Sequence, residues 1–236
     1  MKNLLLKTTA IAVFALSASA QAITINSIAA DWSPAQLTDG TAATYINTDG
    51  ITGNEEIRWG SPATNAGRSG YRFDSSPVPA NVAINNAFSL GEFTHFNFPV
   101  YAPSLDKANL NIGMNFTLDG GTILNKTFSF LFDHDETPNS DVNNCCNDLV
   151  NVSDLVTTDV FVIGSTTYTL SLKGFLQNGA TVNSFSTIEN LANTATLMGV
   201  FTEYTPTPTD VPEPAPLLLF GLGLLGLIGA RKLKAK

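Results

Sequence analysis

The chain has 236 residues, of which 44% are hydrophobic and only 14% charged, with a formal net charge of −8. Of its 12 Lys and Arg residues, two lie in the first 22 positions and four in the last 26, which leaves six in the part between. Of its 20 Asp and Glu residues, only one lies in these two end segments, which leaves 19. The part between therefore carries a net charge of about −13. This acidic balance excludes nucleic acid and anionic lipid as expected partners of that part. Many Thr, Asn, Ser and Gly residues with 15 Phe residues predict a β-rich folded domain.

The first 22 residues have the composition of a secretory signal peptide. Lys2 and Lys7 make a positive start, residues 8–16 are apolar, and small residues lie before Ala22. These are the regions that export signals share. We expect export by the Sec machinery and cleavage by signal peptidase after Ala22, with cleavage after Ala20 as the alternative.

Residues 23–204 are expected to form one β domain. Hydrophobic and polar residues alternate over 110–118 and again over 128–132, with Asp119-Gly120-Gly121 between them, which predicts a β-hairpin. A second hairpin is expected from residues 160–163 and 168–172, with Gly164-Ser165 between them. Further strands are expected at residues 22–28, 56–59, 71–73, 87–98 and 197–204, and a helical turn only at 187–193. Short strands with Gly, Asn and Asp turns, and no alternation with helices, predict an all-β antiparallel β-sandwich that is jelly-roll-like.

Acidic and amide side chains crowd the segment that follows the phenylalanines. Their oxygens are the ligands that Ca²⁺ needs, and the candidate ligands are Asp133, Asp135, Glu136, Asn139 and Asp141. The EF-hand pattern is absent, so a solvated acidic loop is the competing interpretation. No other cofactor is expected. Nothing in the spacing fixes two carboxylates at the separation that a glycosidase needs.

Cys145 and Cys146 are the only cysteines in the chain. An exported protein meets an oxidising environment, in which cysteines pair. The alternatives are a disulfide between the two neighbours, which we favour slightly, an intermolecular pair, or two free thiols.

The last 26 residues, 211–236, contain three segments in a fixed order. The tetrad Val211, Pro212, Glu213 and Pro214 is followed by an apolar, uncharged run at 215–230 and by four cations in the last six residues. The apolar run is shorter than the ~20 residues of a comfortable membrane helix, but its basic flank can snorkel. We expect a membrane helix at about 215–230 rather than a buried core helix, because the run has no polar face. Residues 205–210 are expected to be an extended Pro/Thr spacer.

This order of segments resembles the PEP-CTERM sorting signal of Gram-negative bacteria that build extracellular polysaccharide. The resemblance implies that exosortase, a membrane protease, processes the chain near the tetrad after an inner-membrane intermediate. The implied destination is the cell surface, the outer envelope or the extracellular matrix.

A second resemblance rests on Thr94, His95, Asn97 and Pro99, in the order T-H-x-N-x-P. This segment is similar to the motif of the THxN family of PEP-CTERM proteins, which implies export and surface display without an established enzymatic activity. His95 has two interpretations. In the functional one it is a metal ligand or a general base. In the structural one it is a side chain of a strand in which residues 93, 95 and 97 share one face. We expect the structural role, because two histidines cannot fill a His-rich zinc site and no G-x-S-x-G motif is present.

The sequence therefore predicts a protein with no catalytic residues, an exported surface or matrix protein associated with exopolysaccharide in a biofilm. The alternative is a carbohydrate-binding module, with or without Ca²⁺, that stacks sugars on Trp32, Trp59, Tyr71 or Tyr101. A glycan hydrolase is the third interpretation. Burial of both tryptophans would remove the platform that the stacking interpretation needs.

Overall fold

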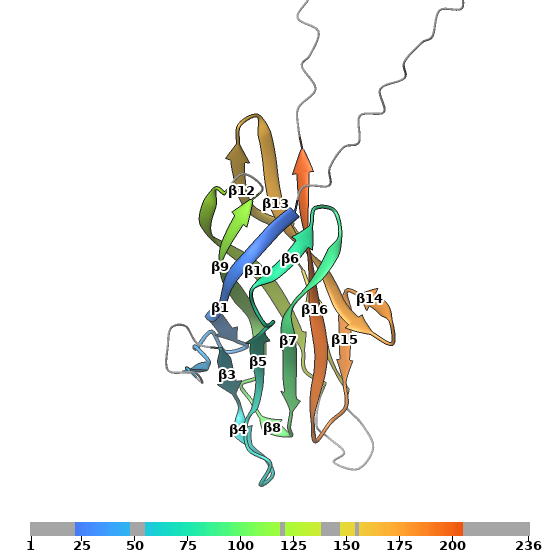
Figure 1. The fold of residues 1–236 in the computed structure, drawn as a ribbon. Helices are drawn as coiled ribbons and strands as arrows, with labels where there is room; N and C mark the ends of the chain where they lie inside the picture. Colours follow the sequence, from blue (N-terminus) through green and yellow to red (C-terminus); the bar gives the residue numbers. More distant parts are fainter. Residues whose placement is uncertain (1–21, 48–54, 119–120, 138–146, 154–155, 205–236) are drawn as a thin grey trace, which may run out of the picture.

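The computed structural model describes residues 22–47, 55–118, 121–137, 147–153 and 156–204, and these residues form strands without a helix (Figure 1). The strands are β1 (Ala22–Leu37), β2 (Thr44–Ile46), β3 (Glu56–Trp59), β4 (Ser61–Pro62), β5 (Ser69–Ser75), β6 (Ala80–Ala83), β7 (Ala87–Asn97), β8 (Val100–Tyr101), β9 (Leu105–Leu118), β10 (Ile123–Asp135), β11 (Asp148–Val152), β12 (Val156–Ile163), β13 (Thr166–Gln177), β14 (Ala180–Val182), β15 (Ser184–Thr187) and β16 (Leu191–Tyr204). The expectation of an all-β protein is confirmed.

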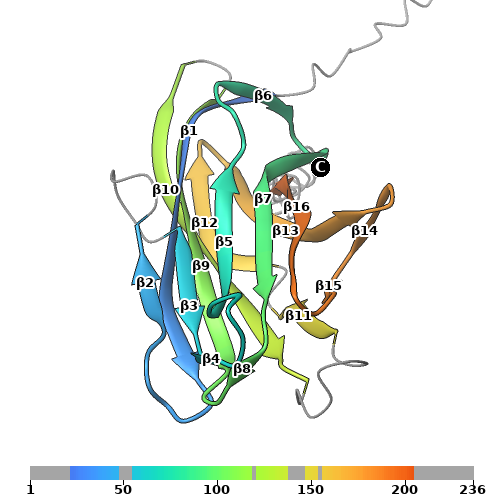
Figure 2. The same ribbon diagram turned by 90° about the horizontal axis from the view of Figure 1, so that it is seen from below.

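The strands form two large antiparallel sheets that curl around one core (Figure 2). The first sheet has the order β15-β11-β10-β9-β1-β6. The second has the order β12-β13-β16-β7-β5-β3-β2, with β14 beside β13, while β4 and β8 pair separately. Consecutive strands β9, β10 and β11 are neighbours in the first sheet, and β12 and β13 in the second. The prediction of an all-β protein with antiparallel sheets is therefore confirmed, while the jelly-roll-like arrangement stays a prediction.

Aromatic side chains join the two sheets. Trp32 of β1 packs on Tyr71 of β5 with ring centroids 5.5 Å apart, and Phe93 of β7 stacks on Phe132 of β10 at 5.6 Å. All four side chains are fully buried. Each contributes about 1.5–3 kcal/mol when removed from water, so these contacts fix how one sheet lies on the other.

The two hairpins expected from the sequence are present. β9 and β10 pair with Phe130 opposite Leu110, and the inward residues of β9 alternate from Ala108 to Leu118. β12 and β13 pair up to Ile163 opposite Thr166. The first strand is longer than expected and continues beyond Ile28 to Leu37, with irregularities in its register with β9. Such bulges shift the inward face by one residue, which hides a strand from a period-two pattern.

The expected helical turn at residues 187–193 is wrong. β15 ends at Thr187 and β16 begins at Leu191, and Asn190 between them has a φ of 64°. The side chain of Asn193 closes this turn, because it accepts a hydrogen bond from the Ile188 backbone N–H and donates one to the Ile188 carbonyl, both at 2.9 Å. The polar residues from which we predicted a helical turn thus form a tight turn between two strands.

The signal peptide, the Pro/Thr spacer and the sorting tail with its expected membrane helix lie outside the described residues. Among the residues that are described, none belongs to a helix long and apolar enough to cross a membrane.

Candidate functional site

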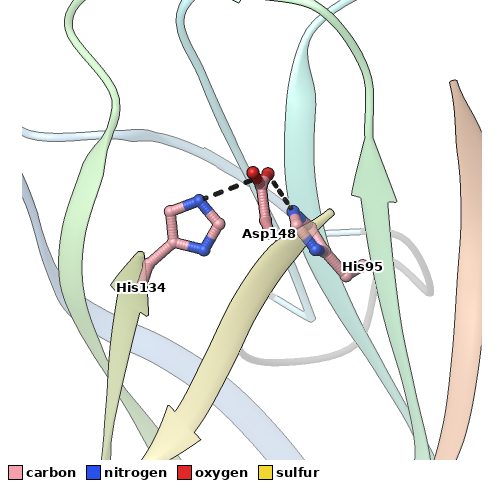
Figure 3. Close-up of side chains that lie close together, drawn as sticks. All are labelled: His95, His134 and Asp148. Carbon is pink, nitrogen blue, oxygen red and sulfur yellow. Dashed lines mark ion pairs between the residues drawn. The ribbon is translucent and has the colours of Figure 1, made fainter. Parts of the chain in front are cut away.

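Two histidines and one aspartate from three strands meet inside the sandwich. His95 lies on β7, where inward and outward residues alternate, and His134 follows three inward phenylalanines on β10. Asp148 is the first residue of β11, and its carboxylate lies between the two imidazole rings (Figure 3). Because β7 belongs to one sheet and β10 and β11 to the other, the group forms only when the sheets pack.

One carboxylate oxygen faces both rings. Asp148 Oδ2 lies 3.8 Å from Nε2 of His134 and 4.0 Å from Nε2 of His95. One candidate ligand atom from each of the three residues lies within 4.8 Å of the other two. The side chains of all three are fully buried. These separations are too long for hydrogen bonds, so the three groups face one another without a direct bond.

The hydrogen bonds of Thr187 fix the proton on His95. The Thr187 hydroxyl donates to the Asp148 carbonyl at 3.2 Å, so its oxygen accepts at 2.8 Å from Nδ1–H of His95. Burial, with His134 adding to it, lowers the pKa of His95 well below its ordinary value, which keeps the ring neutral. With its proton on Nδ1, His95 has a bare lone pair on Nε2.

The two oxygens of Asp148 have different surroundings. Oδ1 accepts hydrogen bonds from the backbone N–H of Thr137 at 2.9 Å and from its hydroxyl at 3.2 Å. Oδ2 is buried and has no hydrogen-bond partner among the described residues. Burial, and next the nearby charge of Glu136, raise the pKa of Asp148 to about 6. The unsatisfied oxygen is the one that faces the two histidines.

His134 has a partner at each ring nitrogen. Its Nδ1 lies 2.7 Å from the Tyr71 hydroxyl, and its Nε2 lies 3.1 Å from Oε2 of Glu136. Burial, followed by the charges of Asp148 and Glu136, raises the pKa of Tyr71 well above its ordinary value, so this hydroxyl keeps its proton. Glu136 is the one member of the group with some exposure, at 13% of its side chain.

Aromatic rings enclose the group. The ring of Trp59 lies 5.1 Å from that of His134 and 6.0 Å from that of His95, and Tyr71 lies 5.1 Å from His95. Ser69 is near His95 Nε2 at 3.5 Å, but its hydroxyl donates to the Phe96 carbonyl at 2.8 Å. In a nucleophilic triad the serine and the aspartate contact opposite nitrogens of the histidine, whereas here both lie on the Nε2 side. The arrangement suits a held ion or a buried polar network better than nucleophilic catalysis.

The residues of the T-H-x-N-x-P segment divide between two faces of β7. His95 and Asn97 point inward as expected, and Asn97 donates to the Thr187 carbonyl at 3.1 Å. Thr94 lies on the other face and is also buried. The strand ends at Asn97, two residues before Pro99. The predicted shared face of residues 93, 95 and 97 is confirmed.

The expected calcium ligands do not form a group among the described residues. Asp133 and Asp135 are exposed on β10, where Asp133 accepts a hydrogen bond from Ser153, and Glu136 contacts His134 instead. Asn139 and Asp141 lie outside the described residues, as do Cys145 and Cys146 and the tetrad Val211, Pro212, Glu213 and Pro214. Calcium binding and the state of the cysteines stay predictions.

Three of the four predicted stacking platforms are wrong. Trp32, Trp59 and Tyr71 are 0%, 1% and 0% exposed, because each fills the space between the sheets. A surface hollow of about 300 Å³ is lined by nine residues of which none is aromatic. Tyr101 on β8 is 67% exposed, so it is the one of the four candidates that keeps a ring at the surface for the carbohydrate-binding alternative.

Sequence reasoning missed that His134 and Asp148 join His95. We argued that two histidines cannot fill a His-rich zinc site, and this stays true, but two histidines with a carboxylate make a different ligand set. The signals were present in the alternation of His134 with the phenylalanines before it and of Asp148 with Val150 and Val152 after it. Thr187 gave no signal, because its role depends on the pairing of β15 with β11.

Residues 210–233 match a family model described as the PEP-CTERM protein-sorting motif. No curated protein matches the chain. The match confirms the PEP-CTERM resemblance of the tail and supports an exosortase-sorted extracellular protein. The motif implies processing by exosortase, with a secreted intermediate that crosses the membrane and ends at the cell surface.

Proposed function

We propose that the chain is a non-catalytic surface or matrix protein of the THxN type, associated with exopolysaccharide in the biofilm of a Gram-negative bacterium. The observation that carries this proposal is the sorting motif at residues 210–233, which follows directly on the β domain. In this proposal the Sec machinery and signal peptidase deliver the chain to the inner membrane, the tail helix holds it there, and exosortase removes the tail.

The interior of the domain supports a role without catalysis. The histidines, the aspartate and the tyrosine that could perform chemistry are buried between the sheets, where a substrate cannot reach them without opening the core. The exposed carboxylates Asp133 and Asp135 lie on the outer face of β10. A protein retained in a hydrated polysaccharide layer needs a stable, soluble body, and the net negative charge of the body favours solubility.

The experiment is the intact mass of the protein recovered from the cell surface and from the medium, in cells with and without active exosortase. We expect the recovered mass to lack the first 22 residues and everything beyond the tetrad at 211–214. In cells without the protease we expect the tail to remain and the protein to stay in the inner membrane. A full-length C-terminus in both strains would contradict the proposal.

Association with polysaccharide has its own test. The processed protein should cosediment with purified exopolysaccharide of the producing cells and be released by salt or by a polysaccharide-degrading enzyme. A protein found wholly free in the medium, with no such association, would contradict the matrix role while leaving the sorting intact.

A further inference from the structure

We propose that His95, His134 and Asp148 bind a first-row divalent metal ion of the Zn²⁺ class, which holds the two sheets together. The proposal goes beyond the sorting function, because it concerns the interior of the domain. It rests on three observations, which are the convergence of the ligand atoms, the unsatisfied carboxylate oxygen, and the groups that orient the two rings.

The ligand atoms have the right kind and spacing. Around an ion with bonds of about 2.0–2.1 Å, tetrahedral ligands are separated by roughly 3.3 Å. Here Nε2 of His134 and Oδ2 of Asp148 are 3.8 Å apart, and Nε2 of His95 and Oδ2 are 4.0 Å apart. The three ligand atoms all lie within 4.8 Å of one another, so movements of up to about 1 Å per side chain bring them to this spacing. Oε2 of Glu136, 3.1 Å from Nε2 of His134, is placed to be the fourth ligand.

The metal-free arrangement leaves two acceptors facing each other. The proton of His95 is on Nδ1, so Nε2 carries a lone pair, and Asp148 Oδ2 is a buried oxygen without a hydrogen-bond partner. At 4.0 Å no proton on either atom can make a hydrogen bond between them. Ser69 does not satisfy Nε2, because its hydroxyl proton goes to the Phe96 carbonyl. A cation between the two atoms satisfies both.

Both histidines have the outer partners that metal-bound histidines usually have. A ligating imidazole commonly donates its second N–H to an oxygen, which fixes the ring. His95 donates from Nδ1 to Thr187 at 2.8 Å, and Nδ1 of His134 lies 2.7 Å from the Tyr71 hydroxyl. This leaves Nε2 of His95 facing Asp148 Oδ2, and Nε2 of His134 facing Glu136 Oε2 at 3.1 Å and Asp148 Oδ2 at 3.8 Å. Imidazole with carboxylate suits Zn²⁺, Fe²⁺ and Ni²⁺ better than Ca²⁺, which takes oxygen ligands.

The site is built to hold an ion rather than to use it. The rings of Trp59 and Tyr71 cover the histidines, so no open position faces solvent as a catalytic zinc requires. The ligands come from β7 in one sheet and from β10 and β11 in the other. An ion bound by all three therefore joins the sheets, and its binding stabilises the folded state.

The test uses the full chain produced without a histidine tag and purified without metal-affinity chromatography. We expect elemental analysis to find about one first-row metal ion per chain. Removal of the ion with a chelator should lower Tm, and Zn²⁺ at about 100 times its Kd should raise it again by about 5–10 °C. Co²⁺ should give the visible absorption of a low-coordinate site with nitrogen ligands.

Asp148→Asn separates a metal site from a polar network. The amide keeps the shape and the acceptor for Thr137 and removes the charge of a buried carboxylate, so the chelator-treated variant should be at least as stable as the chelator-treated wild type. It should lose the bound metal and the response to Zn²⁺. The control is Asp133→Asn, which removes an exposed carboxylate next to His134 in the chain. This variant should keep the bound metal and the response to Zn²⁺. If Asp148→Asn does not fold, His95→Gln takes its place and should lose the bound metal and the response to Zn²⁺. The Co²⁺ spectrum of the wild type then shows whether nitrogen ligands hold the ion.

Three results would overturn the proposal. One is a wild-type chain that purifies without metal and whose Tm does not respond to Zn²⁺, Fe²⁺ or Ni²⁺. Another is metal that stays bound at the same stoichiometry in Asp148→Asn. The third is Co²⁺ bound only in the pale, six-coordinate form that water gives.

Discussion

Thr187 links polar groups of both sheets. Its hydroxyl oxygen accepts from His95 Nδ1 and lies 3.3 Å from the side-chain nitrogen of Asn97, both on β7, and its proton goes to the carbonyl of Asp148 on β11. The residue is fully buried on β15. Buried polar groups are tolerated only when they are hydrogen-bonded, so this hydroxyl makes it possible for His95 and Asn97 to lie inside the core.

Replacement of this hydroxyl is the first residue-scale prediction. Thr187→Val keeps the shape but leaves the buried Nδ1–H of His95 without an acceptor, which costs about 1–3 kcal/mol. Urea denaturation followed by tryptophan fluorescence should show a lower midpoint with an unchanged slope. Thr194→Val, at an exposed position on β16, is the matched control and should change stability by less than about 0.5 kcal/mol. Equal midpoints for the two variants would contradict the role of Thr187.

Glu189 carries the second residue-scale prediction, which concerns pH. Burial, and next the charges of Asp148 and Glu136, raise the pKa of Glu189 from its ordinary value of 4.5 to about 7. Because the folded pKa is the higher one, the folded state binds this proton more tightly, and the resulting stabilisation is lost as pH rises through this range. Both carboxylate oxygens are buried without a hydrogen bond from the described residues, so the ionised form is the costly one.

Glu189→Gln should remove this pH dependence. In chelator-treated protein we expect the variant to be more stable than the wild type by about 1 kcal/mol at about pH 8, after discounting for solvent screening. At about pH 5 the two should differ little. Thermal unfolding at both pH values measures the difference, and Glu203→Gln, at an exposed glutamate, should leave the pH profile as it is. A variant less stable than the wild type at about pH 8 would show that the carboxylate is favourably paired.

At the scale of strands, the sequence predicted those with one continuous buried face. β9 and β10 follow a strict period of two, so their hairpin could be placed from the hydrophobic pattern alone. β1 could not be followed to Leu37, because its register shifts move the buried face between Ile25 and Ser27 and again after Trp32. The inward direction of His134 was predictable from its strand. Its contact with His95 was not, since that contact depends on how two sheets pack.

Gly174 gives the prediction at this scale. It lies where the register of β13 with β16 shifts, with a φ of 105°, and a Cβ there would meet the Val182 carbonyl oxygen of β14 at 2.2 Å. Gly174→Ala combines backbone strain with a clash against backbone, and we expect a loss of about 2–4 kcal/mol. Gly113→Ala on β9 is the control, because its Cβ would have its nearest neighbour at 3.8 Å. This variant should be neutral or slightly stabilising. Equal losses for both would show that the β13–β14 turn adjusts to a side chain.

At the scale of the molecule, the candidate metal centre and the last residues of β16 lie at opposite ends of that strand. The first residues of β16 pair with the end of β7, which carries His95, whereas the 14-residue strand ends at Tyr204 (Figure 1). The sorting motif begins at residue 210. We therefore expect sorting and stability to belong to separate parts of the chain.

Removal of residues 211–236 tests this separation. The body buries its own core and has no described contact that depends on the tail, so we expect the shortened chain to be exported and to fold with the same Tm and the same metal content as the processed protein. It should be lost from the membrane fraction, because the apolar run that holds the intermediate is gone. Immunoblots of cell fractions with thermal unfolding of the purified body measure both. Replacing Pro212, Glu213 and Pro214 by alanine is the matched variant, which should keep the body in the membrane with its tail uncut. A shortened chain that aggregates or melts at a lower temperature would show that the tail also contributes to the fold.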